Sequence, residues 1–138
     1  MRIGATGHVL VLVGALALAG CDAAEPAPVE MLASHRLPQV DGSRLGVTVM
    51  RVLYGPGESS APHTHGCSVV GYVEYGKLRM HVEGEEPAVY EAGETFYEEA
   101  GRRHLVSANL SRELPAQFVA WYACDGDAPL ASYAADVR

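Results

Sequence analysis

Two histidines separated by a single residue mark the stretch of this sequence with the clearest chemistry, Pro-His-Thr-His-Gly-Cys at positions 62–67. Side chains two positions apart in a β-strand point to the same face, so His63 and His65 are expected to project together. A third histidine, His104, follows a Gly-containing turn at a point where another strand should begin. Neutral imidazole binds Zn, Cu, Fe, Ni and, with oxygen ligands, Mn. The sequence therefore predicts a metal site made of His63, His65 and His104.

Short β-rich segments separated by Gly or Pro surround these histidines. Besides the His-x-His strand, we expect strands at 44–54, 68–75, 77–82, 88–90, 95–97, 104–108 and 117–123. The strand at 77–82 alternates charged and apolar residues, which places His81 on the face that points away from the site. Strands at this spacing, without an amphipathic helix, indicate an all-β barrel or sandwich.

The glycine and histidine spacing resembles the two motifs of the cupin superfamily, over residues 44–122. The positions that carry the resemblance are Gly57, His63, His65, Gly76, Gly93, Gly101 and His104. The resemblance implies a double-stranded β-helix, the jelly-roll cupin barrel. Barrels of this kind often associate in pairs, so the resemblance is also compatible with a homodimer.

Three positions depart from the cupin motifs. Val69 stands where the family has its metal-binding Glu, Glu99 replaces a Pro, and Ala108 replaces an Asn, with Asn109 one residue later. The resemblance still implies a metal-binding cupin whose activity is unassigned. Two alternatives stay open: a metal-dependent oxidoreductase of the dioxygenase type that acts on a small molecule, and a metal-free barrel that binds a small ligand.

Cys67 and Cys124 leave three hypotheses open. They could form a disulfide, which an exported protein permits. Cys67 could instead be a thiolate ligand or redox-sensing thiol beside His65. It could also be an inert loop residue.

Several other polar and aromatic residues are expected to lie away from the site. Glu98 and Glu99 precede the turn that leads to His104, and solvation at the surface is favoured for both over a role as base or ligand-orienting group. His35 is expected to be a solvated surface histidine. Core or interface packing is favoured over a place at the pocket for Tyr72, Tyr75, Tyr90, Tyr97 and Trp121.

The first twenty residues have the pattern of a bacterial lipoprotein signal. Arg2 precedes an apolar run, Val9 to Ala19, that is too short to span a membrane. The tetrad Leu18-Ala19-Gly20-Cys21 resembles the lipobox, so we expect cleavage before Cys21 and lipidation of its thiol. Residues 21–34 then form a flexible tether, 35–125 the barrel and 126–138 a tail with little pattern. The expected location is the cell envelope, on the periplasmic side in a Gram-negative cell.

Charge and length narrow the class of partner. The net charge is −7, and removing residues 1–20 takes away Arg2 and no acid, which leaves −8. Such a balance argues against nucleic acids and anionic lipid surfaces as partners. A small-molecule ligand or substrate is expected instead, and contact with the membrane only through the lipid. The remaining chain is long enough for one small domain.

Overall fold

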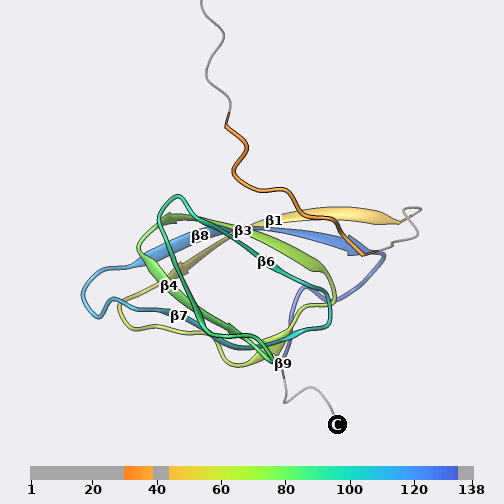
Figure 1. Cartoon of the computed structure of the whole chain (residues 1–138). Coiled ribbons are helices and arrows are strands. Elements are labelled where there is room, and N and C mark those ends of the chain that lie inside the picture. Colours follow the sequence, from red (N-terminus) through yellow and green to blue (C-terminus); the bar gives the residue numbers. More distant parts are fainter. Residues whose placement is uncertain (1–29, 39–43, 134–138) are drawn as a thin grey trace, which may run out of the picture. The chain divides into compact units, whose positions relative to one another are not determined.

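The computed structural model describes residues 30–38 and 44–133, and in this part of the chain all regular structure is β (Figure 1). The strands are β1 (Leu45–Tyr54), β2 (His63–Thr64), β3 (Ser68–Tyr75), β4 (Lys77–Val82), β5 (Ala88–Glu91), β6 (Thr95–Glu98), β7 (Arg103–Asn109), β8 (Ala116–Asp125) and β9 (Ser132–Tyr133). They form two antiparallel sheets, a four-stranded one in the order β1-β8-β3-β6 and a five-stranded one in the order β5-β4-β7-β2-β9. This is the all-β jelly roll that the sequence predicted. Among the described residues, no helix has the length and apolarity needed to cross a membrane.

The core lies between the facing sheets because buried and exposed residues alternate along their strands. In β8, Ala116, Phe118 and Ala120 are buried, whereas the intervening Gln117 and Val119 are only half-buried. Buried side chains on the other strands complete the same layer. They include Val69, Val73, Leu78, Met80 and Phe96. This alternation is the period of two that a half-buried strand requires.

The first half of strand β1 is the exception to this pattern, because its apolar side chains face outward at the edge of the four-stranded sheet. Val47 is 65% exposed and Val49 is 55% exposed. The sequence alternation correctly predicted the strand, but its regular apolar face points to the outer surface. On the neighbouring strand β8, Trp121 lies opposite Val49 and is also exposed.

The predicted strands are all found, with ends that differ from the prediction by at most two residues. Strand β9 was not predicted, because it lies in the tail that has no sequence pattern. The predicted signal peptide at 1–20, Cys21 and the first part of the tether lie outside the described residues, as do residues 134–138. Residues 30–38 are exposed and have no regular structure.

Candidate metal centre

The three predicted histidines converge in one buried cluster. Residues directly opposite each other on paired antiparallel strands share a face, and His63 on β2 lies opposite His104 on β7. His65 follows β2, where its carbonyl accepts a hydrogen bond from the Gly101 amide at 2.7 Å. All three rings are buried, and one nitrogen from each ring lies within 4.8 Å of the others. The structure thus confirms that these side chains meet.

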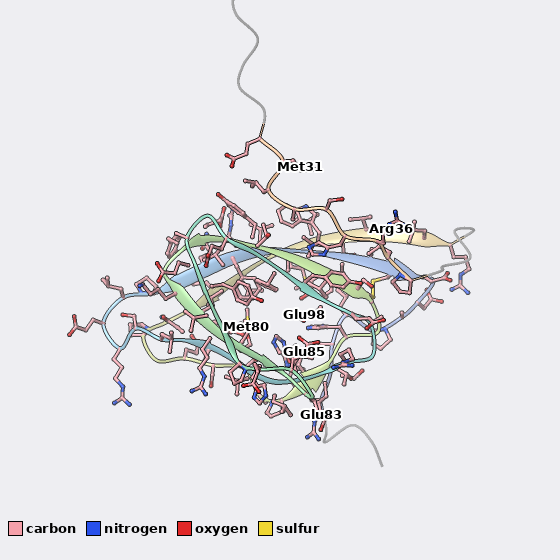
Figure 2. All side chains as sticks on the ribbon, viewed as in Figure 1. Met31, Arg36, Met80, Glu83, Glu85 and Glu98 are labelled. Carbon is pink, nitrogen blue, oxygen red and sulfur yellow. A yellow bond between two sulfur atoms is a disulfide. The ribbon has the colours of Figure 1, made fainter. Side chains whose placement is uncertain are left out.

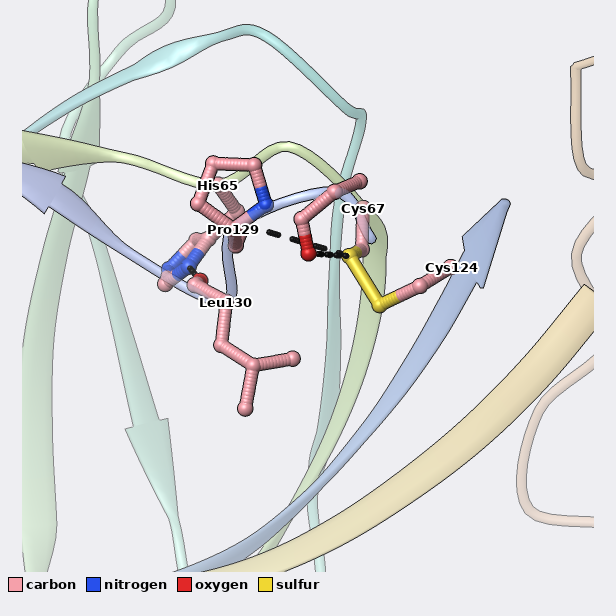
Figure 3. Close-up of a disulfide and its surroundings, with 6 residues drawn as sticks. His65, Cys67, Cys124, Pro129 and Leu130 are labelled. Carbon is pink, nitrogen blue, oxygen red and sulfur yellow. Dashed lines mark hydrogen bonds between the residues drawn. A yellow bond between two sulfur atoms is a disulfide. The ribbon is translucent and has the colours of Figure 1, made fainter. Parts of the chain in front are cut away.

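Backbone carbonyls fix how two of the rings are oriented. Nδ1 of His63 donates to the Ala61 carbonyl at 2.8 Å, and Nδ1 of His65 donates to the Leu130 carbonyl (Figure 3). A carbonyl can only accept, so in each neutral ring the proton is on Nδ1 and Nε2 has a free electron pair. The two Nε2 atoms face each other at 3.1 Å. Two electron pairs at this distance repel unless a cation or a proton lies between them.

His104 contributes a third nitrogen with no partner. Its Nε2 atom is buried and forms no hydrogen bond with any described residue. Leaving a buried polar atom unpaired is costly, so such an atom calls for an explanation. Three imidazole nitrogens directed into one small space are the donor set of a transition-metal site. The residues present therefore fit a divalent metal ion.

Glu98 also belongs to the site, and the expectation that it is solvated at the surface is wrong. The side chain lies between the two sheets, and the residue is 7% exposed (Figure 2). Its Oε2 is 3.2 Å from Nε2 of His65, and its Oε1 is 3.3 Å from Nδ1 of His104. Glu99, by contrast, is exposed as expected. The alternation in β6 was an available signal, since Phe96 and Glu98 share a face of that strand.

The carboxylate of Glu98 acts differently on the two rings that it contacts. Burial lowers the pKa of His65, but the hydrogen bond to Glu98, the Leu130 carbonyl and the charge of Glu98 together raise it above the ordinary value. At His104, burial lowers the pKa by more than the charge of Glu98 raises it. The neighbouring His63 and His65 lower it further, so the pKa of His104 is below its ordinary value. Of the two rings that contact Glu98, His104 is therefore the more easily kept neutral, the form that binds metal.

Residues of the predicted tail also contribute to the site, although no sequence pattern indicated this. Strand β9 pairs with β2, so Tyr133 lies opposite His63, and their ring centres are 5.5 Å apart. The Leu130 carbonyl orients His65. The Gly66 amide donates to the Pro129 carbonyl at 2.9 Å, and a Cβ at position 66 would lie 2.9 Å from Pro129. A glycine is needed there because the tail packs directly on the His-x-His segment.

A disulfide joins Cys67 to Cys124 beside this contact (Figure 3). The pairing of β3 with β8 places Ser68 opposite Ala123, which brings the two cysteines to a Cα separation of 4.6 Å. Sγ of Cys67 also lies 3.8 Å from the Ala128 carbonyl oxygen, a contact without a hydrogen bond because a disulfide sulfur has no proton. Of the three hypotheses for Cys67, the structure thus supports the disulfide and contradicts a free thiolate ligand.

The histidines open onto a cavity of about 290 Å³ between the sheets. Most of its wall is apolar, and none of the described residues that line it is Lys or Arg. Polar groups occur at Tyr54, whose hydroxyl lies 3.0 Å from that of Ser107, and at Ser60, whose buried hydroxyl has no partner among the described residues. The apolar lining residues include Met50, Val52, Val69, Phe96, Phe118 and Leu130.

The five aromatic residues that were expected to pack away from the pocket do not line the cavity, and other tyrosines do. Tyr54, Tyr122 and Tyr133 line it, whereas Tyr72, Tyr75, Tyr90, Tyr97 and Trp121 do not. Burial and then the charge of Glu98 raise the pKa of Tyr122 to about 12, so its hydroxyl stays protonated at neutral pH.

The two remaining histidines of the described domain lie elsewhere. His81 is half-buried opposite Val106 and does not line the cavity, in agreement with its predicted face. His35 is exposed as expected, and its ring stacks on Tyr97 with 4.6 Å between ring centres.

Solved structures with a similar fold come from several kinds of protein. The DMSP lyase DddQ from Ruegeria pomeroyi DSS-3 aligns with a TM-score of 0.57 and 14% identity over 67% of this chain and 45% of that chain. A recombinant oxalate oxidase in complex with glycolate aligns with a TM-score of 0.54 and 22% identity, over 78% of this chain and 65% of that chain. An uncharacterised protein with a double-stranded β-helix domain from Klebsiella pneumoniae subsp. pneumoniae MGH 78578 aligns with a TM-score of 0.51 and 25% identity, over 59% of this chain and 70% of that chain. The chain thus spans less than half of the lyase, and these likenesses show a shared fold.

None of the curated proteins matches this sequence. A family model, by contrast, matches residues 50–122, which is more than half of the chain and includes all three histidines. The family is Cupin_2, described as a cupin domain, and the chain belongs to it.

Proposed function

We propose that this protein binds one divalent transition-metal ion through His63, His65 and His104 and presents it to a small molecule in the cavity. The observation that carries the proposal is the set of three buried ring nitrogens that face one another. Nε2 of His63 and Nε2 of His65 face each other at 3.1 Å, and Nε2 of His104 is buried without a partner. Imidazole ligands suit Zn, Fe, Mn, Ni and Cu, and the donor set does not select among them.

The cavity indicates which small molecules fit beside the ion. A bound ion with open positions supplies a Lewis acid that can polarise a ligand oxygen. The chain supplies a mostly apolar wall, and none of the described residues that line the cavity is Lys or Arg. A dianion would find no cationic side chain there and would face the Glu98 carboxylate. The cavity therefore favours an uncharged or singly charged molecule with an apolar body, and the unpaired Ser60 hydroxyl can hydrogen-bond its polar end.

One observation favours the metal-free alternative, a barrel that binds a small ligand without an ion. The contacts with Glu98 and Leu130 raise the pKa of His65 despite its burial. Nε2 of His65 would then donate its proton to Glu98 at 3.2 Å or to Nε2 of His63 at 3.1 Å, and no ion would be needed between the rings. Metal content separates the two functions, because a protonated cluster holds no ion.

The test is elemental analysis of purified parent protein and four single alanine variants. His63→Ala, His65→Ala and His104→Ala should each lose most of the bound metal, because each removes one of the three ligands. His81→Ala is the matched control, since His81 lies outside the cavity, and it should keep the parent's metal content. Equal metal in the parent and in His104→Ala would show that the cluster does not hold the ion.

We further propose that the protein is exported and held at the cell envelope by lipid on Cys21. The support is the sequence Leu18-Ala19-Gly20-Cys21 after a short apolar run. Several acyl chains on one cysteine give a stable anchor, whereas a single chain gives only reversible binding.

A further inference from the structure

The four-stranded sheet has an apolar outer face, on the side away from the cavity. Residues directly opposite each other on paired strands share a face. Trp121 on β8 lies opposite both Val49 on β1 and Val70 on β3. Val70 in turn lies opposite Tyr97 on β6, so one row of side chains crosses the whole sheet. An exposed apolar patch of this kind marks a contact surface. The exposed apolar residues of this outer face are Leu45, Val47, Val49, Leu53 and Trp121.

The N-terminal segment of the described domain reaches the barrel at the same face. The ring of His35 stacks on Tyr97, the last residue of the row, with 4.6 Å between ring centres. Figure 1 shows residues 30–38 on the side of the four-stranded sheet away from β4 and β7. Cys21 precedes Met31 by only ten residues, and a chain of that length spans at most about 36 Å. A lipid on Cys21 would therefore keep the outer face close to the bilayer.

The charges of the domain favour the same orientation. Arg51, the charged residue of β1 on the outer face, is paired with Glu74 on β3 at 3.4 Å. The turn between β4 and β5 is acidic and exposed, and Figure 2 shows its Glu83 and Glu85 on the far side of the barrel from Met31. A strongly negative protein is repelled by anionic lipid. Turning the outer face to the bilayer keeps this acidic turn away from it, and the contact is then apolar.

We propose that the outer face rests on the lipid bilayer, with Trp121 at the level of the head groups. This inference rests on the proposed lipid anchor, and it extends the membrane contact expected from the sequence, which was through the lipid alone. Tryptophan favours the interface between membrane and water, because its ring is apolar and its N–H group can form a hydrogen bond. A second copy of the chain is the other possible occupant. The anchor favours the bilayer, because a tethered surface meets its partner at a high effective concentration, whereas a second copy has to be met by diffusion.

The experiment uses Trp121 as a probe of this contact, because it is the only tryptophan in the chain. The lipidated protein is purified from membranes and reconstituted into phosphatidylcholine vesicles, with or without bromine atoms near the head-group end of the acyl chains. Bromine quenches tryptophan emission only at short range. The emission of Trp121 should therefore be strongly reduced in the brominated vesicles. Flotation with the vesicles checks that the protein is anchored.

Two variants serve as controls. Trp121→Phe/Val89→Trp moves the tryptophan to an exposed position of β5 in the five-stranded sheet, where its emission should not be quenched. Val47→Glu/Leu53→Glu keeps Trp121 and adds two charges to the outer face, at exposed positions that do not lie opposite Trp121. This variant should float with the vesicles like the parent, because the lipid still anchors it. Its Trp121 emission should recover, because the charged face no longer rests on the bilayer.

Each outcome decides the question. Quenching in the parent that is absent in both variants supports the contact. A parent that floats with the vesicles but is not quenched overturns the proposal; if acrylamide then loses access to Trp121 as the protein density rises, a second copy covers the face. Equal quenching at positions 121 and 89, or quenching that the two added charges do not change, also overturns it, because the barrel then has no preferred apolar face. A parent that does not float would refute the proposed lipid anchor itself, and this inference with it.

Discussion

Removing the disulfide between Cys67 and Cys124 should destabilise the barrel by about 4 kcal/mol. A cross-link acts mainly by restricting the unfolded chain, and its effect grows with the length of the loop that it closes. The two cysteines are 57 positions apart. For that length the chain-entropy relation gives about 14 cal/mol/K, or about 4 kcal/mol at room temperature. Since domains are commonly stable by only about 5–15 kcal/mol, this is a large fraction of the total.

Urea unfolding of matched variants measures this contribution. Both chains carry Cys21→Ser, so that Cys67 and Cys124 are the only cysteines left. One chain also carries Cys67→Ala/Cys124→Ala. With a urea dependence of about 1–3 kcal/mol/M, a loss of this size lowers the unfolding midpoint by roughly 1–4 M. Unfolding the disulfide-containing chain in the presence of a reductant should give the same lower midpoint.

Two results would refute this reasoning. Two free thiols in the denatured, unreduced Cys21→Ser chain would show that the disulfide does not form. Coinciding midpoints, with the disulfide present, would show that the cross-link does not restrict the unfolded chain as the loop length requires.

Three further predictions concern other parts of the chain. Gly71→Ala should cost roughly 1–3 kcal/mol in urea unfolding, because an added Cβ would lie 2.0 Å from the Phe96 ring. Gly46→Ala, with nothing within 4 Å of the added Cβ, is its control and should have little effect. Since burial raises the pKa of Tyr122 to about 12, its contribution to stability is intact below about pH 10 and lost as the pH rises towards 12. An ultraviolet phenolate titration of parent and Tyr122→Phe checks this: equal phenolate absorbance of the two is expected up to about pH 10, and a difference of about half a phenolate near pH 12. Cys21→Ser should move the protein out of the membrane fraction, and an unchanged distribution would argue against lipidation.

The strands and their faces were predictable because they depend on local alternation. In β4, Leu78 and Met80 point inward and His81 does not line the cavity, as the period of two requires. The convergence of His63 with His104 was predictable only through the family resemblance, because it depends on pairing between strands far apart in the sequence.

The parts of the site that were missed depend on register or on irregular backbone. Glu98 was assigned to the surface because charged residues are usually exposed, and its contact with His65 follows from the β3–β6 register, which the sequence does not display. Leu130 contributes a backbone carbonyl, which any residue could supply. Tyr133 pairs through a strand of only two residues, too short to show a periodic pattern.

The pairing of the histidine strand also determines when the site can form during folding. Strand β2 consists of two residues and is held between β7 and β9, so His63 has no sheet partner until residues near 104 and 133 are in place. The edge strand β1 likewise cannot pair until β8 is present, since Leu45 pairs with Asp125. Non-local pairings of this kind require the closure of long loops and are typical of domains that fold in milliseconds to seconds. A growing chain therefore cannot pair the histidine strand on both sides before Tyr133 has been synthesised, and a ligand of the fully paired site binds a nearly finished barrel.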